Sequence, residues 1–353
     1  MKDEKNILVV RLSSLGDVLM TLPAVKAIKN LYPGSHISWL IEGSISDLLS
    51  YQGFIDKVIR FPRTGLVQKI KHGNISGSMT IARSFLNDLR ALEYDLIIDF
   101  HGIIKSIILS RCARGKRLIG FDKIYAKESS HLFYDERIPG IDRRLHKVER
   151  NMLMATYLGA GAQEAPDIEL TVPARYQEYI DNFFREKGIS DNVIAVNPFS
   201  SPGSEFKRWG ISRYKGLIKR LRAQLGADIV ILWGPGEKEE ARSLIDESDN
   251  GVFLSCPTDI PQLFALLKRV RLYISGDTGV MHLAAAAKTP VVAIFGPTDH
   301  RINAPYGMHS SIVRKDIYCS PCKTKDCPDR GCLEEISIDE VFYAAKEMYY
   351  RTR

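Results

Sequence analysis

The sequence predicts an α/β protein of two doubly wound domains, in which helices cover both faces of a parallel sheet. Short apolar runs alternate with amphipathic helical stretches, which is the pattern of strand–helix–strand units. The alternation begins a second time after Leu170, and 353 residues are too many for one ordinary domain but sufficient for two. Two such domains facing each other would enclose a cleft, lined by the loops that follow the strands.

The first domain is predicted to span residues 1–172. A helix at Ile103–Cys112 directly follows one of its apolar runs, as expected where parallel strands are joined by helical crossovers. The strands are expected at Ile7–Leu12, His36–Ile41, Lys57–Phe61 and Asp95–Phe100.

The second domain is predicted to span residues 173–335. Its helix at Ser212–Gly226 ends on a glycine, which suits the left-handed conformation at a helix C-terminus. A last helix is expected within residues 336–353, after the alternating strands and helices of the second domain. It is expected to pack back on the first domain. The strands are expected at Val193–Phe199, Ile229–Trp233, Leu272–Ser275 and Pro290–Phe295, and further helices at Lys238–Glu247 and Val280–Ala287.

Charge and hydropathy limit the class of protein. The formal net charge of +7 favours anionic partners, such as nucleotides, nucleic acid, phosphorylated lipids or an anionic membrane face. The first apolar stretch, Ile7–Val10, is too short for the core of a signal peptide, and no stretch reaches the ~18 apolar residues of a membrane helix. We therefore expect a cytoplasmic protein, at most peripheral on a membrane.

The loop after the first strand, Ser13–Asp17, is a candidate site. Gly16 permits a tight turn that exposes backbone amides at a helix N-terminus, which is a natural seat for phosphate. Asp17 would repel that phosphate, so it is either a general base or a helix cap, and the residues alone leave both open. The loop lacks the G-x-G-x-x-G pattern, which argues against a dinucleotide dehydrogenase.

The loop over residues 197–209 offers the hydroxyls of Ser200 and Ser201 and, at its end, Lys207. A lysine here can neutralise a diphosphate. The alternative is a surface lysine beside a packed Trp209.

A glycine-rich loop, residues 234–237, ends in Glu237. Its glycines let a ligand approach the backbone closely. The carboxylate of Glu237 can accept hydrogen bonds from a ribose diol. The alternative is an ordinary residue of a first helical turn.

A fourth loop opens the alanine-rich helix within residues 275–287. Thr278 and Gly279 would present amides to an anion at the helix start. His282 lies one turn further along, where it can point at the same ligand or be a satisfied structural histidine.

At these residues the sequence resembles glycosyltransferase family 9, the ADP-heptose:lipopolysaccharide heptosyltransferases. The resemblance runs from Ile7 to about Ile336. Its strongest segments are RLSSLGDVLMTLPA at Arg11–Ala24, YDLIIDFHGIIKS at Tyr94–Ser106 and SGDTGVMHLAAAAKTPVVAIFGPTD at Ser275–Asp299.

Within that family the sequence is most similar to the heptosyltransferases I, which add the first heptose to the inner Kdo sugar. The segments Lys127–Ser129 and His146–Arg150 carry this similarity. His101 departs from the pattern, because the family commonly has glutamine there, and this puts hydrogen bonding to the acceptor in doubt.

The resemblance implies the GT-B fold of two Rossmann-like domains, ADP-heptose as donor, inversion at the anomeric carbon, and no requirement for a metal or other cofactor. Asp17 would be the base that deprotonates the acceptor hydroxyl. The first domain would bind the acceptor, through Ser14, Gly16, His101, Lys105, Lys127 and Arg150. The second would bind the donor, through Ser200, Ser201, Lys207, Glu237, Asp277, Thr278, Gly279 and His282.

The implied partners are ADP-heptose and Kdo-lipid A or a lipopolysaccharide core, with peripheral contact to the inner membrane face and no nucleic acid. Two alternatives stay open. One is a transferase of the same family that adds the second or third heptose, and the other is a non-catalytic protein that binds the sugar nucleotide.

Four cysteines lie close together near the end of the chain, with the spacing C-x2-C-x4-C-x4-C. Such spacing suits one tetrahedral zinc ion. Free thiols in a reducing cytosol fit equally well, and any metal here would be structural. The residues are Cys319, Cys322, Cys327 and Cys332.

Overall fold

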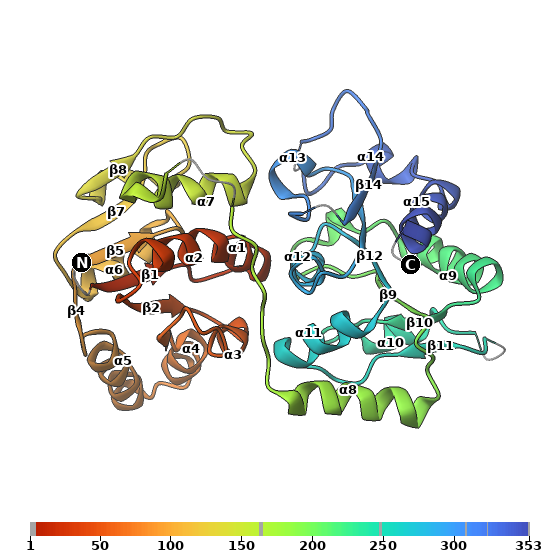
Figure 1. The fold of residues 1–353 in the computed structure, drawn as a ribbon, viewed down its shortest axis with the longest axis horizontal. Coiled ribbons are helices and arrows are strands. Elements are labelled where there is room, and N and C mark those ends of the chain that lie inside the picture. Colours follow the sequence, from red (N-terminus) through yellow and green to blue (C-terminus); the bar gives the residue numbers. More distant parts are fainter. Residues whose placement is uncertain (1–4, 162–164, 247–248, 308, 323, 352–353) are drawn as a thin grey trace. The chain divides into compact units, whose positions relative to one another are not determined.

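The chain is described here from a computed structural model, which covers residues 5–161, 165–246, 249–307, 309–322 and 324–351 (Figure 1). It divides into two compact units, Met1–Thr171 and Val172–Arg353. The division falls one residue before the boundary that the sequence predicts. Among the described residues, no helix is both long and apolar enough to cross a membrane.

Unit 1 contains a six-stranded parallel sheet, in the order β3-β2-β1-β5-β7-β8. Its central strand is apolar on both faces, as parallel sheets covered by helices require, and Ile7–Val10 are fully buried. The strands are β1 (Asn6–Val10), β2 (His36–Ile41), β3 (Lys57–Arg60), β5 (Leu96–Asp99), β7 (Leu118–Phe121) and β8 (Glu136–Ile138), and a separate pair joins β4 (Glu93–Tyr94) to β6 (Arg114–Gly115).

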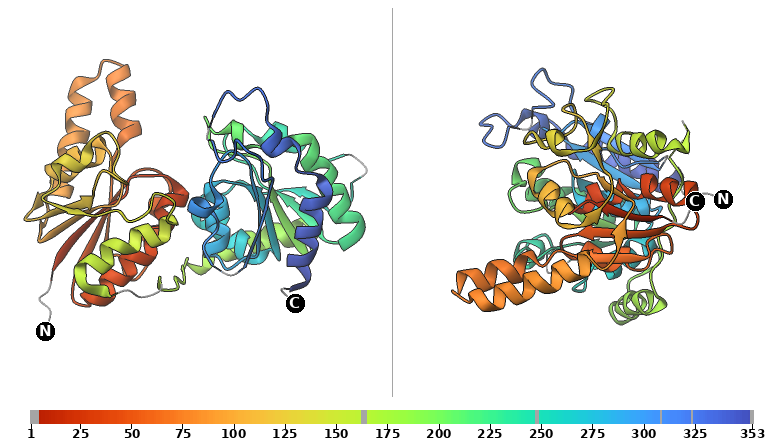
Figure 2. Two further views of the ribbon diagram at one scale, coloured as in Figure 1. Left: turned by 90° about the horizontal axis from the view of Figure 1, so that it is seen from above. Right: turned by 90° about the vertical axis from the view of Figure 1, so that its left-hand side faces the viewer.

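Helices cover both faces of this sheet. Side chains of α5 (Ile75–Leu89) and α6 (Ile104–Cys112) join one core cluster with β1. On the opposite side, α2 (Leu22–Leu31) and α7 (Lys147–Ala155) pack together (Figure 2). The short elements are α1 (Leu15–Leu19), α3 (Ile45–Leu49), α4 (Arg63–Lys71), the 3₁₀ turn η1 (Ser130–Phe133) and the π-turn η2 (Thr156–Ala160).

Unit 2 repeats the architecture with the sheet order β11-β10-β9-β12-β13-β14, again with parallel neighbours. Counted within each sheet, both orders are 3-2-1-4-5-6, which is the Rossmann arrangement. The prediction of two doubly wound, Rossmann-like domains is confirmed. The strands are β9 (Val193–Asn197), β10 (Asp228–Ile231), β11 (Val252–Leu254), β12 (Leu272–Gly276), β13 (Val291–Phe295) and β14 (Ser310–Arg314).

The helices of unit 2 also form two layers. One layer contains α9 (Ile211–Leu225), and α8 (Ala174–Lys187) packs on α11 (Ile260–Arg269) in the other. The remaining helices are α10 (Lys238–Arg242), α12 (Gly279–Ala286), α13 (His300–Asn303), α14 (Gly331–Glu334), α15 (Ile338–Arg351) and the 3₁₀ turn η3 (Glu205–Lys207).

The last helix, α15, is part of unit 2, so the expectation of a separate element packed on the first domain is wrong. It packs on α9 and on β12 to β14. Phe342 and Ala345 are fully buried in the same core cluster as these strands. Arg271 donates two hydrogen bonds, of 2.9 and 3.2 Å, to the carbonyl of Tyr349. The apolar side of α15, spaced at helical intervals, is thereby buried within its own unit.

Candidate active site

Asp17 lies in the first turn of α1, directly after the loop that connects β1 to this helix. Ser14 is the N-cap residue of α1, and its backbone N and Oγ lie 3.5 and 3.2 Å from Asp17 Oδ2. A carboxylate three residues after a serine N-cap is a capping arrangement, so Asp17 does stabilise the start of the helix. The interpretation of Asp17 as a helix cap is therefore confirmed by these distances. Capping does not account for the other partners of the carboxylate.

Asp17 is also held by two cations. Arg11 Nη2 lies 3.0 Å from Oδ2, and Lys147 Nζ lies 2.7 Å from Oδ1. Burial works against ionisation, but the charges of Arg11 and Lys147 outweigh it and hold the pKa of Asp17 far below its usual 3.8. The carboxylate is therefore ionised throughout the pH range in which enzymes work, and in this state it is a weak base.

A cavity of about 90 Å³ lies against this carboxylate. Its wall carries four cationic side chains and one carboxylate, so an anionic group is the ligand that its charge favours. The aromatic part of the wall consists of Phe100, Phe121 and Tyr125. The polar part consists of Arg11, Asp17, His101, Lys127, Lys147, Arg150 and Asn151.

His101 is neutral in this wall. Its Nδ1 accepts a hydrogen bond from the amide of Leu12 at 3.1 Å. Burial, together with the charge of Arg11, lowers the pKa of His101 from 6.5 to about 3. Because Nδ1 is an acceptor, the proton of the neutral ring is on Nε2, which makes that atom a donor. A glutamine amide also offers a donor, so His101 keeps one hydrogen-bonding role of the residue it replaces.

Two predicted cations lie at the same cavity. The guanidinium of Arg150 stacks on the ring of Tyr125, 4.3 Å from its centroid, and its buried Nε has no hydrogen-bond partner among the residues that the structure describes. Lys127 is exposed and precedes two residues in the left-handed region, Glu128 and Ser129. Glu128 accepts a hydrogen bond from the first amide of α6, at 3.0 Å, which fixes the turn beside Lys127.

Other predicted acceptor residues lie apart from the cavity wall. Lys105 Nζ is 2.5 Å from Oε1 of Glu42, so its charge is already paired. Ser14 caps α1 and Gly16 lies in its first turn, but neither lines the cavity. From the predicted set, the structure thus brings Asp17, His101, Lys127 and Arg150 together in the wall of one cavity.

The sequence prediction missed Arg11 and Lys147, the two partners of Asp17. Both lie in segments that carry the family resemblance, the first at Arg11–Ala24 and the second at His146–Arg150. The residue types alone gave no reason to single them out. Their role follows from the ion pairs, one of which spans 130 residues of chain.

Asp99 is a second carboxylate that the prediction missed. It ends β5 and is fully buried, and burial raises its pKa. Its Oδ1 accepts the amides of His101 and Gly102 at 2.8 and 3.2 Å. Its Oδ2 accepts the hydroxyls of Ser106 and Tyr134 at 2.6 and 2.9 Å. Asp99 therefore positions the loop that carries His101.

Asp99→Ala should destabilise the protein by about 3–5 kcal/mol, because four buried donors lose their acceptor. Asp99→Asn is the matched control, since its amide oxygen can still accept the two backbone amides. Urea unfolding followed by circular dichroism measures both changes. A loss below about 1 kcal/mol for the alanine variant would show that Asp99 does not organise this loop.

In unit 2, the predicted donor loops follow β9, β10 and β12, which are neighbours in the sheet. Lys207 Nζ lies 2.9 Å from Oδ2 of Asp277, so the loop after β9 is tied to the loop after β12. These two strands flank the point where the strand order reverses, which is where open parallel sheets bind ligands. In unit 1, the Asp17 and His101 loops follow β1 and β5 and flank the equivalent point.

Glu237 closes the loop after β10. Its Oε2 accepts the amide of Gly234 at 2.8 Å, and its Oε1 lies 3.0 Å from Nη2 of Arg208. The same guanidinium donates to the hydroxyl and carbonyl of Ser200, at 3.1 and 3.0 Å. Arg208, which the sequence prediction did not single out, therefore links two of the predicted donor loops. Burial raises the pKa of Glu237.

The predicted residues Thr278 and Gly279 form the start of α12. Thr278 is the N-cap residue, and its side chain accepts the amide of Met281 at 3.3 Å. Gly279 is the first residue of the helix, and His282 is buried one turn later. Ser201 is exposed on the loop after β9, whereas Ser200 is buried.

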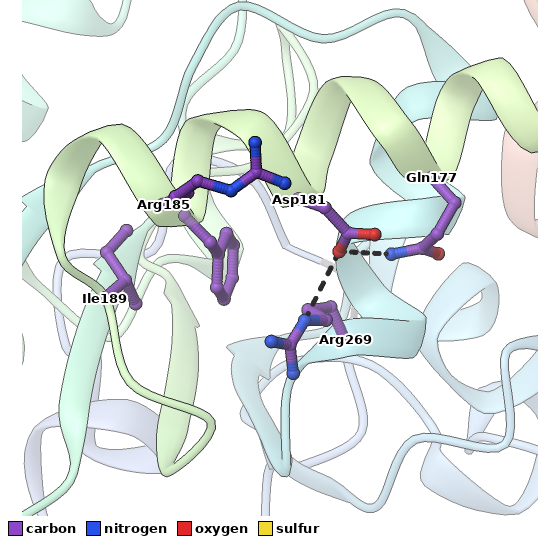
Figure 3. Close-up of a pocket in the computed structure, with 6 residues that line it drawn as sticks. Gln177, Asp181, Arg185, Ile189 and Arg269 are labelled. Carbon is purple, nitrogen blue, oxygen red and sulfur yellow. Dashed lines mark hydrogen bonds and ion pairs between the residues drawn. The ribbon is translucent and has the colours of Figure 1, made fainter.

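A separate surface hollow lies between α8 and α11 (Figure 3). Its carboxylate, Asp181, already has two partners: Gln177 donates to it at 3.1 Å, and Arg269 Nε lies 3.4 Å away. The polar groups of the hollow thus satisfy one another, and it follows no strand end at the switch point. We do not assign it a ligand.

The four C-terminal cysteines are free thiols in the structure. Burial raises the pKa of Cys332 to about 11, and the nearby sulfurs of Cys322, Cys319 and Cys327 add to this effect. Within the described ranges, no group of three or more His, Cys, Asp or Glu side chains is arranged to hold a metal ion. Structural zinc and free thiols remain the two alternatives for these four cysteines, as the sequence left them.

Two Rossmann-like units, each with charged loops at its switch point, are the architecture of GT-B glycosyltransferases. The model of glycosyltransferase family 9 (heptosyltransferase) matches residues 82–332, which is more than half of the chain, so the protein belongs to this family. It is therefore a glycosyltransferase, as the sequence predicts.

Individual relatives agree over nearly the whole length. Lipopolysaccharide heptosyltransferase 1 of Pseudomonas aeruginosa is 27% identical over 335 residues, covering 91% of this chain and 87% of the relative. Lipopolysaccharide heptosyltransferase 3 of Escherichia coli K12 is 29% identical and covers 82% of each chain. Relatives named heptosyltransferase 1 and heptosyltransferase 3 are thus about equally similar to this chain.

Solved structures confirm the GT-B fold. A family 9 glycosyl transferase from Veillonella parvula superposes with a TM-score of 0.83 at 23% identity and 99% coverage of both chains. Escherichia coli heptosyltransferase WaaC, solved with ADP-2-deoxy-2-fluoro heptose, gives a TM-score of 0.74 at 25% identity and covers 97% of this chain and 99% of its own.

Proposed function

We propose that the protein transfers L-glycero-D-manno-heptose from ADP-heptose to the Kdo region of the lipopolysaccharide inner core, with inversion at the anomeric carbon. The observation that carries the proposal is the ionised Asp17 in a cationic cavity at the switch point of unit 1. Relatives named lipopolysaccharide heptosyltransferase 1 support the acceptor. The proposed site of action is the cytoplasm, peripheral to the inner membrane face.

Asp17 is the proposed general base. One of its carboxylate oxygens takes the proton of the acceptor hydroxyl while the acceptor oxygen bonds to the anomeric carbon and the bond to the ADP oxygen breaks. The ion pairs of the free protein keep Asp17 weakly basic. An acceptor carboxylate that draws Lys147 to itself would raise the pKa of Asp17, so the bound acceptor itself would make the base more effective.

On the acceptor side, the cationic wall suits the carboxylates and phosphates of a Kdo-lipid acceptor. Arg150 offers its guanidinium from a position over the ring of Tyr125, and Lys127 offers an exposed ammonium at the cavity. His101 offers a neutral donor, as its lowered pKa requires. Ser14, Gly16 and Lys105 are proposed to act from the starts of α1 and α6, beside the cavity.

On the donor side, negative charge builds up on the departing diphosphate, and positively charged groups have to stabilise it. Lys207 and the amides of Thr278 and Gly279 are proposed to provide this stabilisation. Asp277 orients Lys207, at the 2.9 Å distance given above. Glu237 is proposed to accept the ribose hydroxyls, with Ser200, Ser201 and His282 lining the rest of the donor site.

Incubation with ADP-heptose and Kdo-lipid A, followed by mass spectrometry, tests the proposal. We expect a mass gain of one heptose, and none when the acceptor already carries its first heptose. Transfer only onto a heptosylated acceptor would instead indicate a transferase of the second or third heptose. Binding of ADP-heptose without turnover on any acceptor would indicate a non-catalytic sugar-nucleotide protein.

Treatment with a metal chelator should leave transfer unchanged, since Lys207 and helix amides supply the charge that a metal ion would otherwise provide. The measurement is turnover before and after chelation, with elemental analysis of the purified protein. Stoichiometric zinc with unchanged turnover would support a structural site at the four cysteines. Lost turnover that zinc restores would contradict the mechanism.

A further inference from the structure

Helices α4 and α5 form a hairpin joined by residues 72–74. The two helices pack on each other, but no side chain of α4 is buried. The buried apolar residues of α5, Phe85 and Leu89, lie in its second half, where they join the core of unit 1. Figure 2 shows the hairpin projecting from the rest of this unit. It is therefore fastened at its base, and its tip extends into solvent.

The tip, defined here as residues 67–79, exposes four large apolar side chains on the two sides of the turn. They are Val67 (42% exposed), Ile70 (64%), Ile75 (70%) and Met79 (67%). Val67 and Ile70 are three residues apart on α4, and Ile75 and Met79 are four apart on α5, so each pair shares a helix face. Single exposed apolar residues are ordinary, but four at one tip form a patch that suits an apolar partner.

The residues of the tip itself carry positive charge only. No Asp or Glu occurs from residue 57 to residue 87. Lys69 and Lys71, which alternate with Ile70 at the end of α4, make no ion pair within the described part of the chain. The cations of this acid-free stretch are Lys57, Arg60, Arg63, Lys69, Lys71 and Arg83.

We propose that the tip of the α4–α5 hairpin is a docking surface for an anionic phospholipid bilayer. The four apolar side chains enter the interface between headgroups and acyl chains, and Lys69 and Lys71 contact the phosphates. A bilayer is favoured over a protein partner because the tip itself carries lysines and no carboxylate beside its apolar side chains, which is the composition that anionic lipids attract. The biological purpose rests on the proposed lipid-linked acceptor, but the binding itself does not.

Flotation of the full-length protein with vesicles tests this without any substrate. One set of vesicles contains phosphatidylglycerol and phosphatidylcholine, and the other contains phosphatidylcholine alone. We expect binding to the anionic vesicles that weakens as salt is raised, and at least about tenfold weaker binding to the neutral ones.

Two variants separate the apolar and charged contributions. The triple change Ile70→Ser, Ile75→Ser and Met79→Ser should weaken vesicle binding by about tenfold or more, and Lys69→Glu with Lys71→Glu should weaken it similarly and remove its salt dependence. Ile141→Ser is the matched control, since this isoleucine of unit 1 is 73% exposed outside the hairpin. Thermal unfolding midpoints should not change, because the replaced residues are exposed.

Equal vesicle binding by the triple variant and the Ile141 control would overturn the proposal, and so would absence of binding by the unaltered protein. Self-association that the triple variant abolishes would assign the tip to a second copy of the chain instead. Intact vesicle binding without heptose transfer would contradict the proposed function alone. Loss of vesicle binding with unchanged transfer to a soluble acceptor fragment would support the docking surface and leave the proposed chemistry intact.

Discussion

Replacing Asp17 by asparagine should lower the turnover of heptose transfer by about 10²–10⁴-fold while ADP binding is retained. The amide has nearly the shape of the carboxylate and can still accept from Ser14, but it cannot take a proton from the acceptor. Arg11 and Lys147 lose the charge that they pair with in the free protein. Turnover should therefore fall without loss of the fold or of the donor site.

Asp47→Asn is the matched control, because Asp47 also belongs to a short helix of unit 1 and pairs with Arg60 at 2.6 Å. It should turn over normally. A folded Asp17→Asn protein with near-normal turnover would exclude Asp17 as the base and leave it a helix cap.

The pH profile gives an independent check. Because the pKa of Asp17 is held below 3.8, it stays ionised as the pH falls toward that value, and its protonation cannot produce an acid limb near pH 6 in the free enzyme. The imidazole of His101 stays neutral down to about pH 3. We therefore expect that neither Asp17 nor His101 causes an acid limb in the pH profile of kcat/KM between about pH 5 and 7. The shape of the profile in this range should be the same for the unaltered protein, for Asp17→Asn and for His101→Gln.

Lys207→Ala should weaken ADP binding by about 10- to 100-fold. The change removes the ammonium proposed to meet the diphosphate. It also leaves Asp277, which is 9% exposed, without its cationic partner and close to the ligand's negative charge. Both effects act against the diphosphate, so the loss should exceed that of a surface lysine.

Isothermal titration calorimetry with ADP measures this loss. Glu237→Ala should weaken binding less, because it removes hydrogen bonds to the ribose but no cation. Lys127→Ala is the control and should bind ADP normally, since it lies in unit 1 at the acceptor cavity. The reverse order, with Lys127→Ala weakened and Lys207→Ala unaffected, would contradict the assignment of the nucleotide to unit 2.

The strands and helices were largely predictable because each has a local pattern. The apolar run at Ile7–Leu12 became β1 at Asn6–Val10, and the helix predicted at Ile103–Cys112 became α6 at Ile104–Cys112. Elements with weaker patterns, such as the short edge strand β8 and the exposed helix α4, were not predicted. An element that buries few side chains leaves little periodicity in the sequence.

The last helix shows where local pattern stops being informative. The apolar face of α15 predicted a helix, but this face packs on α9 and on strands β12 to β14. Helix α9 ends more than a hundred residues before α15 begins. An apolar helix face indicates that the helix is buried on that side, but it does not show which element it packs against. Only the packing within unit 2 showed to which of the two domains α15 belongs.

By itself the sequence determined the two Rossmann-like domains, the loops at their strand ends and, through the family resemblance, the class of enzyme. It placed Asp17 where the first strand passes into the first helix but left it either a cap or a base. The tertiary structure supplied Lys147, 130 residues away, and the pairing of Lys207 with Asp277, 70 residues away. The crossovers of a parallel sheet bring such loops to one edge, so the charge that surrounds a side chain depends on topology, which no local pattern contains.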